Sequence, residues 1–380
     1  MTFVFSADGH VVEPNDLFTK HMPASLAHYA IRSEIRGDYR CTVSGDKLIH
    51  KLRLRAAQAG DEPPDPTITR KLAEGEKPAR KALGSNNVPG RLADMRDEGI
   101  DAEIAFPSLA LWTYCVESVE GEYATCQIYN DFNHDFFKDH SDTFVRCGVL
   151  PVRNLDYTKR ELRRLAERGY TAAMLPVVTM AGIPKYNDAV WDPVFALAGE
   201  LGIAFVLHTG TGLEDVVVER GPGGAVVNYT RQMNDGADAI MGMVAGGLLD
   251  RNPQARVAVI EAGASWLPAL AERMDEVYLA HYAMVRPKLG RMPSQIIRDQ
   301  VKCSFQYDRA CIMARSVVGA GALMWGADYP HAEGTFPISR SVIAKLFEGI
   351  EISEQDKADI VGLNAARLFR LKRPEIAHLL

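Results

Sequence analysis

Side chains that bind metal ions stand at the ends of several short apolar runs in this sequence. Asp8 and His10 follow the first run with one residue between them, so both face the same side if the extended geometry continues. His208 ends a later run, Glu261 ends another, and Asp328 and His331 follow the last one. Carboxylate and imidazole ligands together suit Zn²⁺, Mn²⁺ or Fe²⁺. We therefore expect these residues to form one metal-dependent site: Asp8, His10, His208, Glu261, Asp328 and His331.

Each of these residues also has a simpler interpretation. A lone histidine such as His208 after an apolar strand often only forms a structural hydrogen bond, and the Asp8 and His10 pair fits a capped turn. Glu261 is also explained as a helix cap or salt-bridge partner, and His331 as a group that only orients Asp328. The shared position of all six at strand ends favours the metal site.

The elements that must position these side chains repeat along the chain. Short apolar runs, each followed by polar or Gly-rich residues and an amphipathic segment, indicate alternating strands and helices. We predict strands at 3–7, 102–107, 146–151, 172–176, 204–208, 256–260, 302–306 and 322–326. We predict helices at 90–98, 123–139, 157–168, 192–201, 238–249, 265–280, 309–318 and 339–346. Eight such units favour an α/β fold of the (β/α)8 barrel type, a TIM barrel, over an open sheet.

Two long segments depart from a minimal barrel. Residues 13–89, with Pro63, Pro64 and Pro66, are predicted to form a cap or insertion after the first strand, within a single domain spanning 1–380. Residues 209–236 are Gly-rich and are predicted to form a second insert after the fifth strand. A further helix is expected at 353–371, because its Ser353 start resembles a capping box. Both inserts leave the strand ends at which barrel enzymes build their sites.

The composition favours a small-molecule substrate. The 43 Lys and Arg residues and 49 Asp and Glu residues give a formal charge of −6 without long runs of one sign, which argues against a nucleic-acid partner. Six cysteines without a CxxC pair suit a reducing cytosol and are predicted to be small core residues. The N-terminus is a poor signal peptide, and no apolar stretch reaches the roughly 18 residues of a membrane helix. We expect a cytoplasmic protein with no membrane partner.

Several motifs, weak singly and specific together, give the sequence a resemblance to a known family. They are Ser6-Ala7-Asp8-Gly9-His10-Val11-Val12-Glu13-Pro14, Arg91-Leu92-Ala93-Asp94-Met95, Gly99-Ile100-Asp101-Ala102, Tyr129-Asn130-Asp131-Phe132, His208-Thr209-Gly210, Glu261-Ala262-Gly263-Ala264-Ser265-Trp266-Leu267-Pro268, Trp325-Gly326-Ala327-Asp328-Tyr329-Pro330-His331 and Gly362-Leu363-Asn364-Ala365-Ala366-Arg367-Leu368. Almost end to end, the chain resembles the amidohydrolase-related group (amidohydrolase 2), which includes aminocarboxymuconate-semialdehyde decarboxylase and resorcylate decarboxylases.

The resemblance implies a metal held by Asp8, His10, His208 and Asp328. The ion would polarise a substrate oxygen or lower the pKa of bound water, with Asp328 as proton shuttle. The implied activity is that of a lyase (decarboxylase) or hydrolase on a small carboxylated or cyclic substrate. Asp328, Glu261 and His331 are the candidate catalytic residues.

This sequence departs from the family pattern at two positions. Asp8-Gly9-His10 stands where many members have His-x-His, which makes the site more anionic, and Glu261 stands where the decarboxylases have a histidine. With six ligands instead of four, two ions become an alternative, as in a dinuclear iron or manganese–iron oxygenase (hydroxylase). A third hypothesis is a non-catalytic partner subunit of a barrel hetero-oligomer. We rank it last because none of the four ligands is missing.

Substrate contacts are predicted less sharply. Trp112 and Tyr114 follow the second strand and residues 176–180 follow the fourth, which predicts aromatic and apolar walls at the mouth of the pocket. Tyr307, after the seventh strand, is a separate candidate for a substrate contact. Arg231, on the segment after the fifth strand, is either a bidentate ligand for a substrate carboxylate or a surface residue. The resemblance also implies a homodimer or a higher oligomer.

Overall fold

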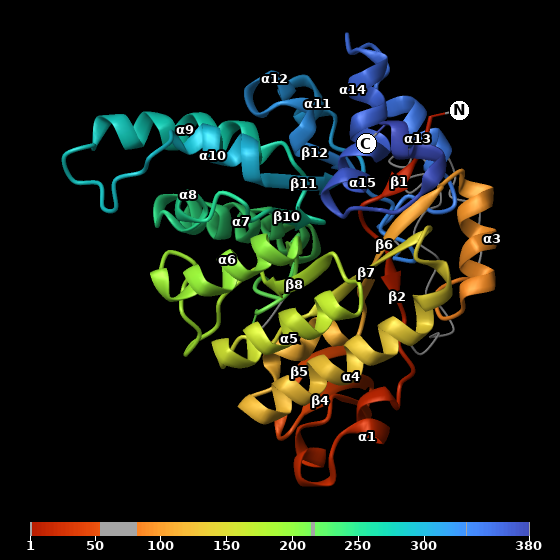
Figure 1. Ribbon diagram of the computed structural model, residues 1–380. Coiled ribbons are helices and arrows are strands. Elements are labelled where there is room, and N and C mark those ends of the chain that lie inside the picture. The colour runs from red at the N-terminus through yellow and green to blue at the C-terminus, as the bar shows by residue number, and fades with distance from the viewer. Residues whose placement is uncertain (1, 54–81, 214–216, 332, 380) are drawn as a thin grey trace.

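The computed structural model describes residues 2–53, 82–213, 217–331 and 333–379, and its centre is a barrel of parallel strands (Figure 1). The strands of the barrel are β1 (Phe5–Ser6), β2 (His10–Val11), β6 (Ala102–Pro107), β7 (Phe144–Val149), β8 (Ala172–Pro176), β9 (Ala204–His208), β10 (Val257–Ile260), β11 (Val301–Phe305) and β12 (Leu323–Trp325). They pair in the order β1-β6-β7-β8-β9-β10-β11-β12, and β2 also pairs with β6.

The last strand returns beside the first. The backbone N–H of Ala7 donates to the carbonyl of Trp325 at 2.9 Å, and the N–H of Asp328 donates to the carbonyl of Asp8 at 2.9 Å. The barrel is therefore nearly closed, and the predicted (β/α)8 class is confirmed. The first predicted strand is followed by the separate short strand β2, so that Asp8 lies between the two.

Burial explains why the strands could be predicted from the sequence. Strands β6, β7, β8 and β9 are buried along their full length. Barrel strands have packed side chains on the inner face and helices on the outer face, so they form continuous apolar runs. The bounds of β6, β8 and β9 coincide with the predicted ones.

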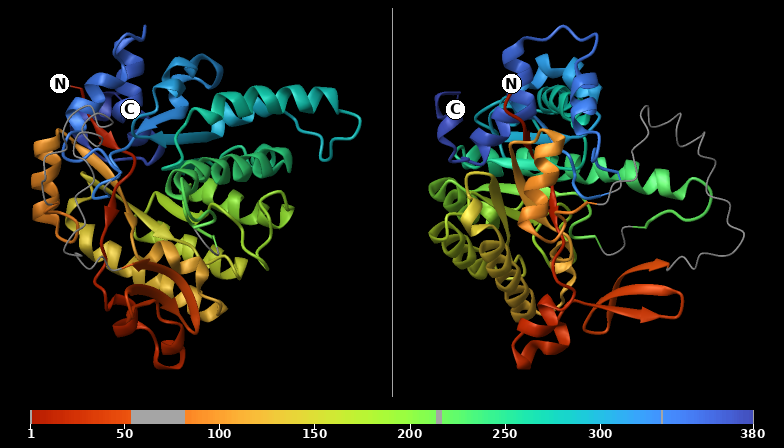
Figure 2. Two further views of the ribbon diagram at one scale, coloured as in Figure 1. Left: turned by 180° about the vertical axis from the view of Figure 1, so that it is seen from behind. Right: turned by 90° about the vertical axis from the view of Figure 1, so that its right-hand side faces the viewer.

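Helices surround the barrel and cover the outer face of the strands (Figure 2). They are α3 (Val88–Glu98), α4 (Val119–Phe137), α5 (Leu155–Glu167), α6 (Asp192–Leu201), α7 (Gly224–Ala245), α8 (Leu248–Arg251), α9 (Trp266–Ala280), α10 (Pro293–Gln300), α11 (Arg309–Met313), α12 (Arg315–Val318), α13 (Ser339–Leu346), α14 (Glu354–Ala358) and α15 (Asn364–Leu368). Local sequence fixes their ends. For α3, the side chain of Asn87 accepts a hydrogen bond from the Gly90 N–H at 2.7 Å, and Gly99 ends the helix at φ 70°.

The second insert predicted at 209–236 is helical in its last 13 residues. Residues from Gly224 onward form the first turns of α7, which starts 14 residues before the predicted helix at 238–249. Most side chains from Ala225 to Arg231 are exposed, because these turns extend beyond the barrel. A helix that buries no face has no apolar periodicity, and the sequence pattern was therefore that of a loop.

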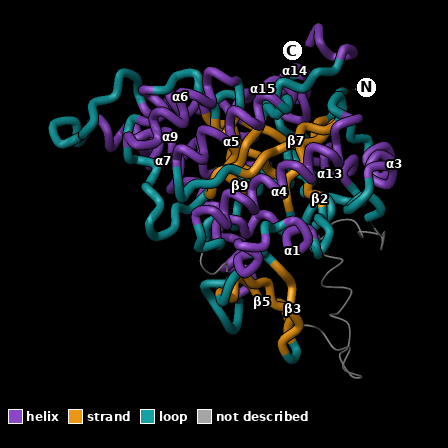
Figure 3. Tube along the Cα trace, turned by 60° about the horizontal axis from the view of Figure 1, so that its bottom comes forward, coloured by secondary structure: helices purple, strands orange, loops and turns teal. Residues whose placement is uncertain are grey.

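The segment after β2 forms its own small sheet. It contains α1 (Leu17–His21) and the antiparallel strands β3 (Arg32–Arg36), β4 (Tyr39–Ser44) and β5 (Lys47–Arg53). Figure 3 shows this sheet standing away from the barrel strands. The predicted insertion after the first strand is thus present, while Pro63, Pro64 and Pro66 lie outside the described residues.

The chain ends in the predicted C-terminal helical segment, broken into consecutive pieces. The hydroxyl of Ser353 accepts a hydrogen bond from the Asp356 N–H at 3.0 Å and starts α14. A wide helical turn leads to α15, where the Asn364 amide donates to the carbonyls of Ala320 and Leu323, both at 2.9 Å. The segment is thereby anchored to the start of β12.

The composition-based expectations concern the core and the membrane. All six cysteines are free and buried, as predicted for small core residues. Within the described residues, no helix is both long and apolar enough to cross a membrane.

Candidate metal centre

The six predicted residues converge at the carboxyl ends of the barrel strands. The Nε2 atom of His10 lies 3.2 Å from Nε2 of His208, 3.6 Å from Oδ1 of Asp8 and 3.5 Å from Oδ1 of Asp328. The Nε2 atom of His208 also lies 3.5 Å from Oε2 of Glu261. The side chains of Asp8, His10 and Asp328 are fully buried.

Both central histidines are oriented by backbone carbonyls. The Nδ1 atom of His10 lies 2.7 Å from the carbonyl oxygen of Pro107, and Nδ1 of His208 lies 2.9 Å from that of Thr209. A carbonyl only accepts hydrogen bonds, so each Nδ1 carries the proton and each Nε2 presents a lone pair. Burial, followed by the charge of His331, lowers the pKa of His10 to about 3, so its imidazole is neutral. Two lone pairs that face each other at 3.2 Å are placed to hold a cation between them.

Two carboxylates of the cluster also have oxygens to which no described residue donates a hydrogen bond. Both oxygens of Asp8 and Oδ2 of Asp328 are buried without a hydrogen-bond partner among the described residues. A buried carboxylate that stays ionised without a partner is costly unless a cation compensates it.

Backbone strain marks two of the six positions. Glu261 and Asp328 adopt φ values of 63° and 54°, in the left-handed region that non-glycine residues rarely occupy. The N–H of Glu261 donates to the hydroxyl of Ser304 at 3.0 Å, which holds the strained turn in place. Such conformations persist where the surrounding structure enforces them, and they gather at functional sites.

Glu261 and His331 form the more open side of the cluster. Their side chains are 16% and 32% exposed, whereas the side chain of Asp328 is fully buried. Nδ1 of His331 lies 2.8 Å from Oδ1 of Asp328, and the ring of His331 lies 4.2 Å from that of His10. Burial and the carboxylates of Asp328 and Asp8 raise the pKa of Glu261 well above its usual value. Burial also raises the pKa of Asp328, to about 6.

The spacing of the ligand atoms fits a metal ion. A metal bonds imidazole nitrogen at about 2.0–2.1 Å, so two nitrogens at cis angles on one ion lie about 3.0–3.4 Å apart. The 3.2 Å between the Nε2 atoms of His10 and His208 falls in this range. The potential ligands form two groups that share His10: one with Asp8 and His208, the other with Glu261, Asp328 and His331.

A buried network holds the strand-1 ligands from behind. Nη1 of Arg91 donates to the carbonyl of His10 at 2.6 Å, and Nε donates to Glu103 at 2.8 Å. The guanidinium lies 4.1 Å from the ring centre of Tyr329, whose hydroxyl donates to Asp94 at 2.6 Å. Arg91 and Asp94 were recognised in the sequence only as parts of family motifs, and this positioning role was not predicted.

Two more residues near the cluster were missed. Glu333, beyond the eighth strand, raises the pKa of Tyr229 more than any other group, followed by burial and the charges of Glu261 and Asp328. Tyr229 on α7 is therefore close enough to the cluster for its negative charges to act on the phenol. It also lines a cavity of about 460 Å³ with His50 and other residues of the 217–232 segment. The helix was predicted to start only at 238, so Tyr229 was not expected near the cluster.

The predicted substrate residues lie in different surroundings. Trp112 is half-buried and stacks on His50 of β5, with ring centres 5.4 Å apart. Tyr114 is buried, and its hydroxyl donates to the Met174 carbonyl at 2.9 Å, so it belongs to the packed interior. Arg231 is exposed on α7, and Tyr307 is 50% exposed.

The chain is a nearly closed parallel barrel with a cluster of histidines and carboxylates at the carboxyl ends of its strands. These features place it in the class of barrel proteins that can hold a metal ion at this end. The amidohydrolase family model matches residues 52–371, so the chain belongs to the amidohydrolase family. No curated protein matches the sequence.

Solved structures share the fold across almost the whole chain. An amidohydrolase from Mycobacterium avium subsp. paratuberculosis K-10 is 20% identical, with a TM-score of 0.76 over 97% of this chain and 99% of that one. The 5-carboxyvanillate decarboxylase of Sphingomonas paucimobilis is 20% identical, with a TM-score of 0.67 over 98% and 100%. A manganese-bound dihydroxybenzoic acid decarboxylase from Polaromonas sp. JS666 is 17% identical, with a TM-score of 0.61 over both full chains.

Proposed function

We propose that this protein is a metal-dependent decarboxylase of a small aromatic carboxylic acid. The observation that carries the proposal is the pair of Nε2 atoms 3.2 Å apart on His10 and His208, beside the unpartnered carboxylate of Asp8. The structures with the same fold include decarboxylases of hydroxylated benzoic acids, two of them with manganese. Their similarity supports the choice of substrate class.

In this proposal, Asp8, His10, His208 and Asp328 hold the ion. When bound, a divalent ion supplies charge that polarises a substrate oxygen or lowers the pKa of bound water. The chain's own residues do the rest. The carbonyls of Pro107 and Thr209 keep both imidazoles in the tautomer that offers Nε2 to a cation.

Glu261 is the proposed proton donor. In decarboxylation the bond between the ring carbon and the carboxylate breaks, CO₂ leaves, and the ring carbon takes up one proton. The carboxyl of Glu261 lies beside the ligands and is 16% exposed, so it faces both the cluster and the side from which substrate arrives. After the transfer, Glu261 is an anion that regains its proton from water. His331 hydrogen-bonds to Asp328 and holds that carboxylate in position.

A second candidate, a dinuclear iron or manganese–iron oxygenase, rests on the second ligand group. Glu261, Asp328 and His331 surround His10 as a set separate from Asp8 and His208. If that set held its own ion, Glu261 would be a ligand and would not donate protons. The two candidates therefore differ in the role of one carboxylate.

Decarboxylation without oxygen separates the candidates. Manganese-loaded protein is incubated anaerobically with a panel of hydroxylated benzoic acids, and released CO₂ is measured. We expect turnover on at least one acid, at least about 100-fold slower in Glu261→Gln and unchanged in Glu272→Gln, which alters an exposed carboxyl on α9. If no CO₂ is released anaerobically and iron-loaded protein consumes O₂, the decarboxylase proposal is wrong and the oxygenase candidate takes its place.

A further inference from the structure

A second cavity lies at the opposite end of the barrel from the metal centre. Its volume is about 530 Å³, and Arg256 and Lys302, at the start of β10 and β11, help to line it. Arg256 and Glu261 are separated by five residue steps along β10, which at about 3.3 Å each is roughly 16 Å. The cavity is therefore separate from the metal centre.

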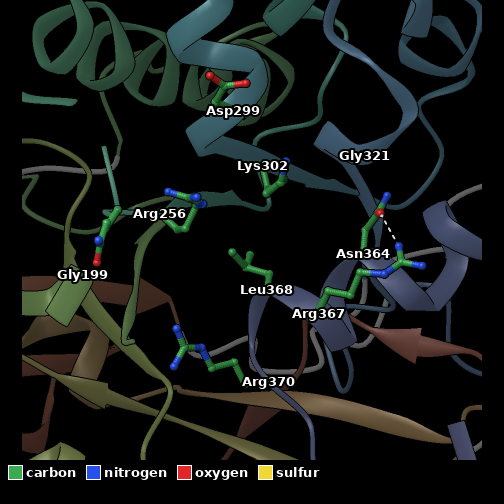
Figure 4. Close-up of a pocket in the computed structure, with 10 residues that line it drawn as sticks. Gly199, Arg256, Asp299, Lys302, Gly321, Asn364, Arg367, Leu368 and Arg370 are labelled. Atoms are coloured by element: carbon green, nitrogen blue, oxygen red, sulfur yellow. Dashed lines mark hydrogen bonds between the residues drawn. The ribbon is translucent and has the colours of Figure 1, made fainter. Parts of the chain in front are cut away.

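The lining of this cavity is strongly basic. Figure 4 shows Arg256, Lys302 and Arg370 arranged around one space, with Arg367 at its edge and Asp299 farther out. These five are the charged residues that line the cavity.

Two of these charged groups are already paired elsewhere. Asp299 binds Nη1 of Arg291 at 3.2 Å, and Nη1 of Arg367 binds Asp359 at 2.8 Å. No salt bridge to Lys302, Arg256 or Arg370 is formed within the described part of the chain. The cavity thus holds three positive charges, and the one carboxylate in its lining, Asp299, is shared with Arg291.

Arg256 is held in place by the backbone, and Arg370, although exposed, lies against the chain at Gly202. Nη1 of Arg256 donates to the carbonyls of Pro253 and Ala255 at 2.8 and 2.9 Å. The guanidinium of Arg370 lies against Gly202, where an added Cβ would stand 1.9 Å from Nη1. The partial negative charge at the C-terminal end of α6 explains why Arg370 lies beside Gly202, but it does not explain the position of Lys302.

The positive charges are only partly compensated, because Asp299 attracts Lys302 and Arg256 but also pairs with Arg291. Burial and the charge of Arg256 lower the pKa of Lys302 to about 8. Burial also lowers the pKa of Arg256, and the charge of Arg370 contributes to this. Holding three like charges together costs stability, and a bound anion would remove that cost.

We propose that this basal cavity, lined by Arg256, Lys302 and Arg370, binds a phosphate-bearing small molecule. A phosphate group offers three oxygens to two guanidinium groups and an ammonium, and guanidinium binds phosphate in a bidentate manner. The volume exceeds that of inorganic phosphate and lies within the usual range for small-molecule sites. Leu368 provides an apolar contact for the organic part of the ligand.

Calorimetric titration with inorganic phosphate and with adenosine monophosphate, at constant ionic strength, tests the proposal. We expect one saturable site in the wild-type protein and at least about tenfold weaker binding in Lys302→Gln and in Arg370→Gln. Arg163→Gln, which removes an exposed arginine on α5, should bind as the wild type does. Tighter binding of the monophosphate would identify an organic phosphate, and equal binding would identify inorganic phosphate.

Two controls keep the result specific. His208→Ala, altered in the metal centre, should retain phosphate binding, because the two sites are at opposite ends of the barrel. Arg370 is exposed, so its variant is expected to fold even if Lys302→Gln does not. The proposal is overturned if wild type shows no saturable binding, if Arg163→Gln weakens it as much, or if His208→Ala abolishes it.

Discussion

Replacing Gly9 with alanine should destabilise the protein and weaken its metal site together. A Cβ at this position would stand 2.5 Å from Oε2 of Glu103 and 2.8 Å from Nη2 of Arg91. An ordinary contact begins at 3.4 Å, so this ion pair must move by about 0.9 Å. The pair is buried and has little room, with side chains 1% and 2% exposed.

The expected loss of stability follows from that displacement. Overpacking a core costs about 1–3 kcal/mol, and breaking a buried ion pair costs about 3–5 kcal/mol. We expect Gly9→Ala to lose about 3 kcal/mol, measured by urea unfolding of metal-free protein. Because Arg91 also bonds the carbonyl of His10, the variant should bind Mn²⁺ more weakly than wild type.

Gly321→Ala is the matched control, because a Cβ there meets nothing within 4 Å. It should change stability by less than about 0.5 kcal/mol. A Gly9→Ala variant as stable as Gly321→Ala, with wild-type metal affinity, would refute the reasoning that this glycine is required for the approach of the ion pair.

Three further predictions concern single groups. Glu122 is buried, and burial raises its pKa from 4.5 to about 7, so the folded protein holds this proton after the unfolded chain has released it. The free energy of unfolding of the wild type therefore falls as pH rises from 4.5 to 7. Between about pH 5 and pH 8, this fall should be smaller in Glu122→Gln by up to about 3 kcal/mol, as measured by paired unfolding curves. The Glu13 carboxylate accepts three backbone N–H bonds at 2.8–3.1 Å, so Glu13→Ala should lower the free energy of unfolding by about 2–4 kcal/mol, and an unchanged urea midpoint would contradict this. Mn²⁺ at about 100 times its Kd should raise that free energy by about 2.7 kcal/mol in wild type, and an equal rise in Asp8→Ala would place the ion elsewhere.

The ligands of the candidate site were predictable because each follows a strand. His208 and Glu261 end buried apolar runs, and the carboxyl ends of parallel strands meet at one end of a barrel. The sequence therefore indicated which side chains gather before any distance was known. The division of the ligands into two groups that share His10 depends on side-chain placement, which strand order does not determine.

The supporting residues were not predictable in the same way. Arg91 and Asp94 lie on α3, far in sequence from Tyr329, and only the closed barrel brings them together. The first turns of α7 expose most of their side chains, so no apolar period marked them as helix or placed Tyr229 near the charges of the cluster. Local patterns report which face of an element is buried, and these features depend on contacts between distant elements.

Metal content per chain tests the central claim most directly, because the claim is that Asp8, His10, His208 and Asp328 hold one divalent ion. Elemental analysis of protein purified without chelators should give one ion per chain for wild type and for His281→Ala, which changes an exposed histidine. His208→Ala should give close to none. Wild type with no bound ion after reloading with Mn²⁺, or His208→Ala with a full ion, would contradict the account.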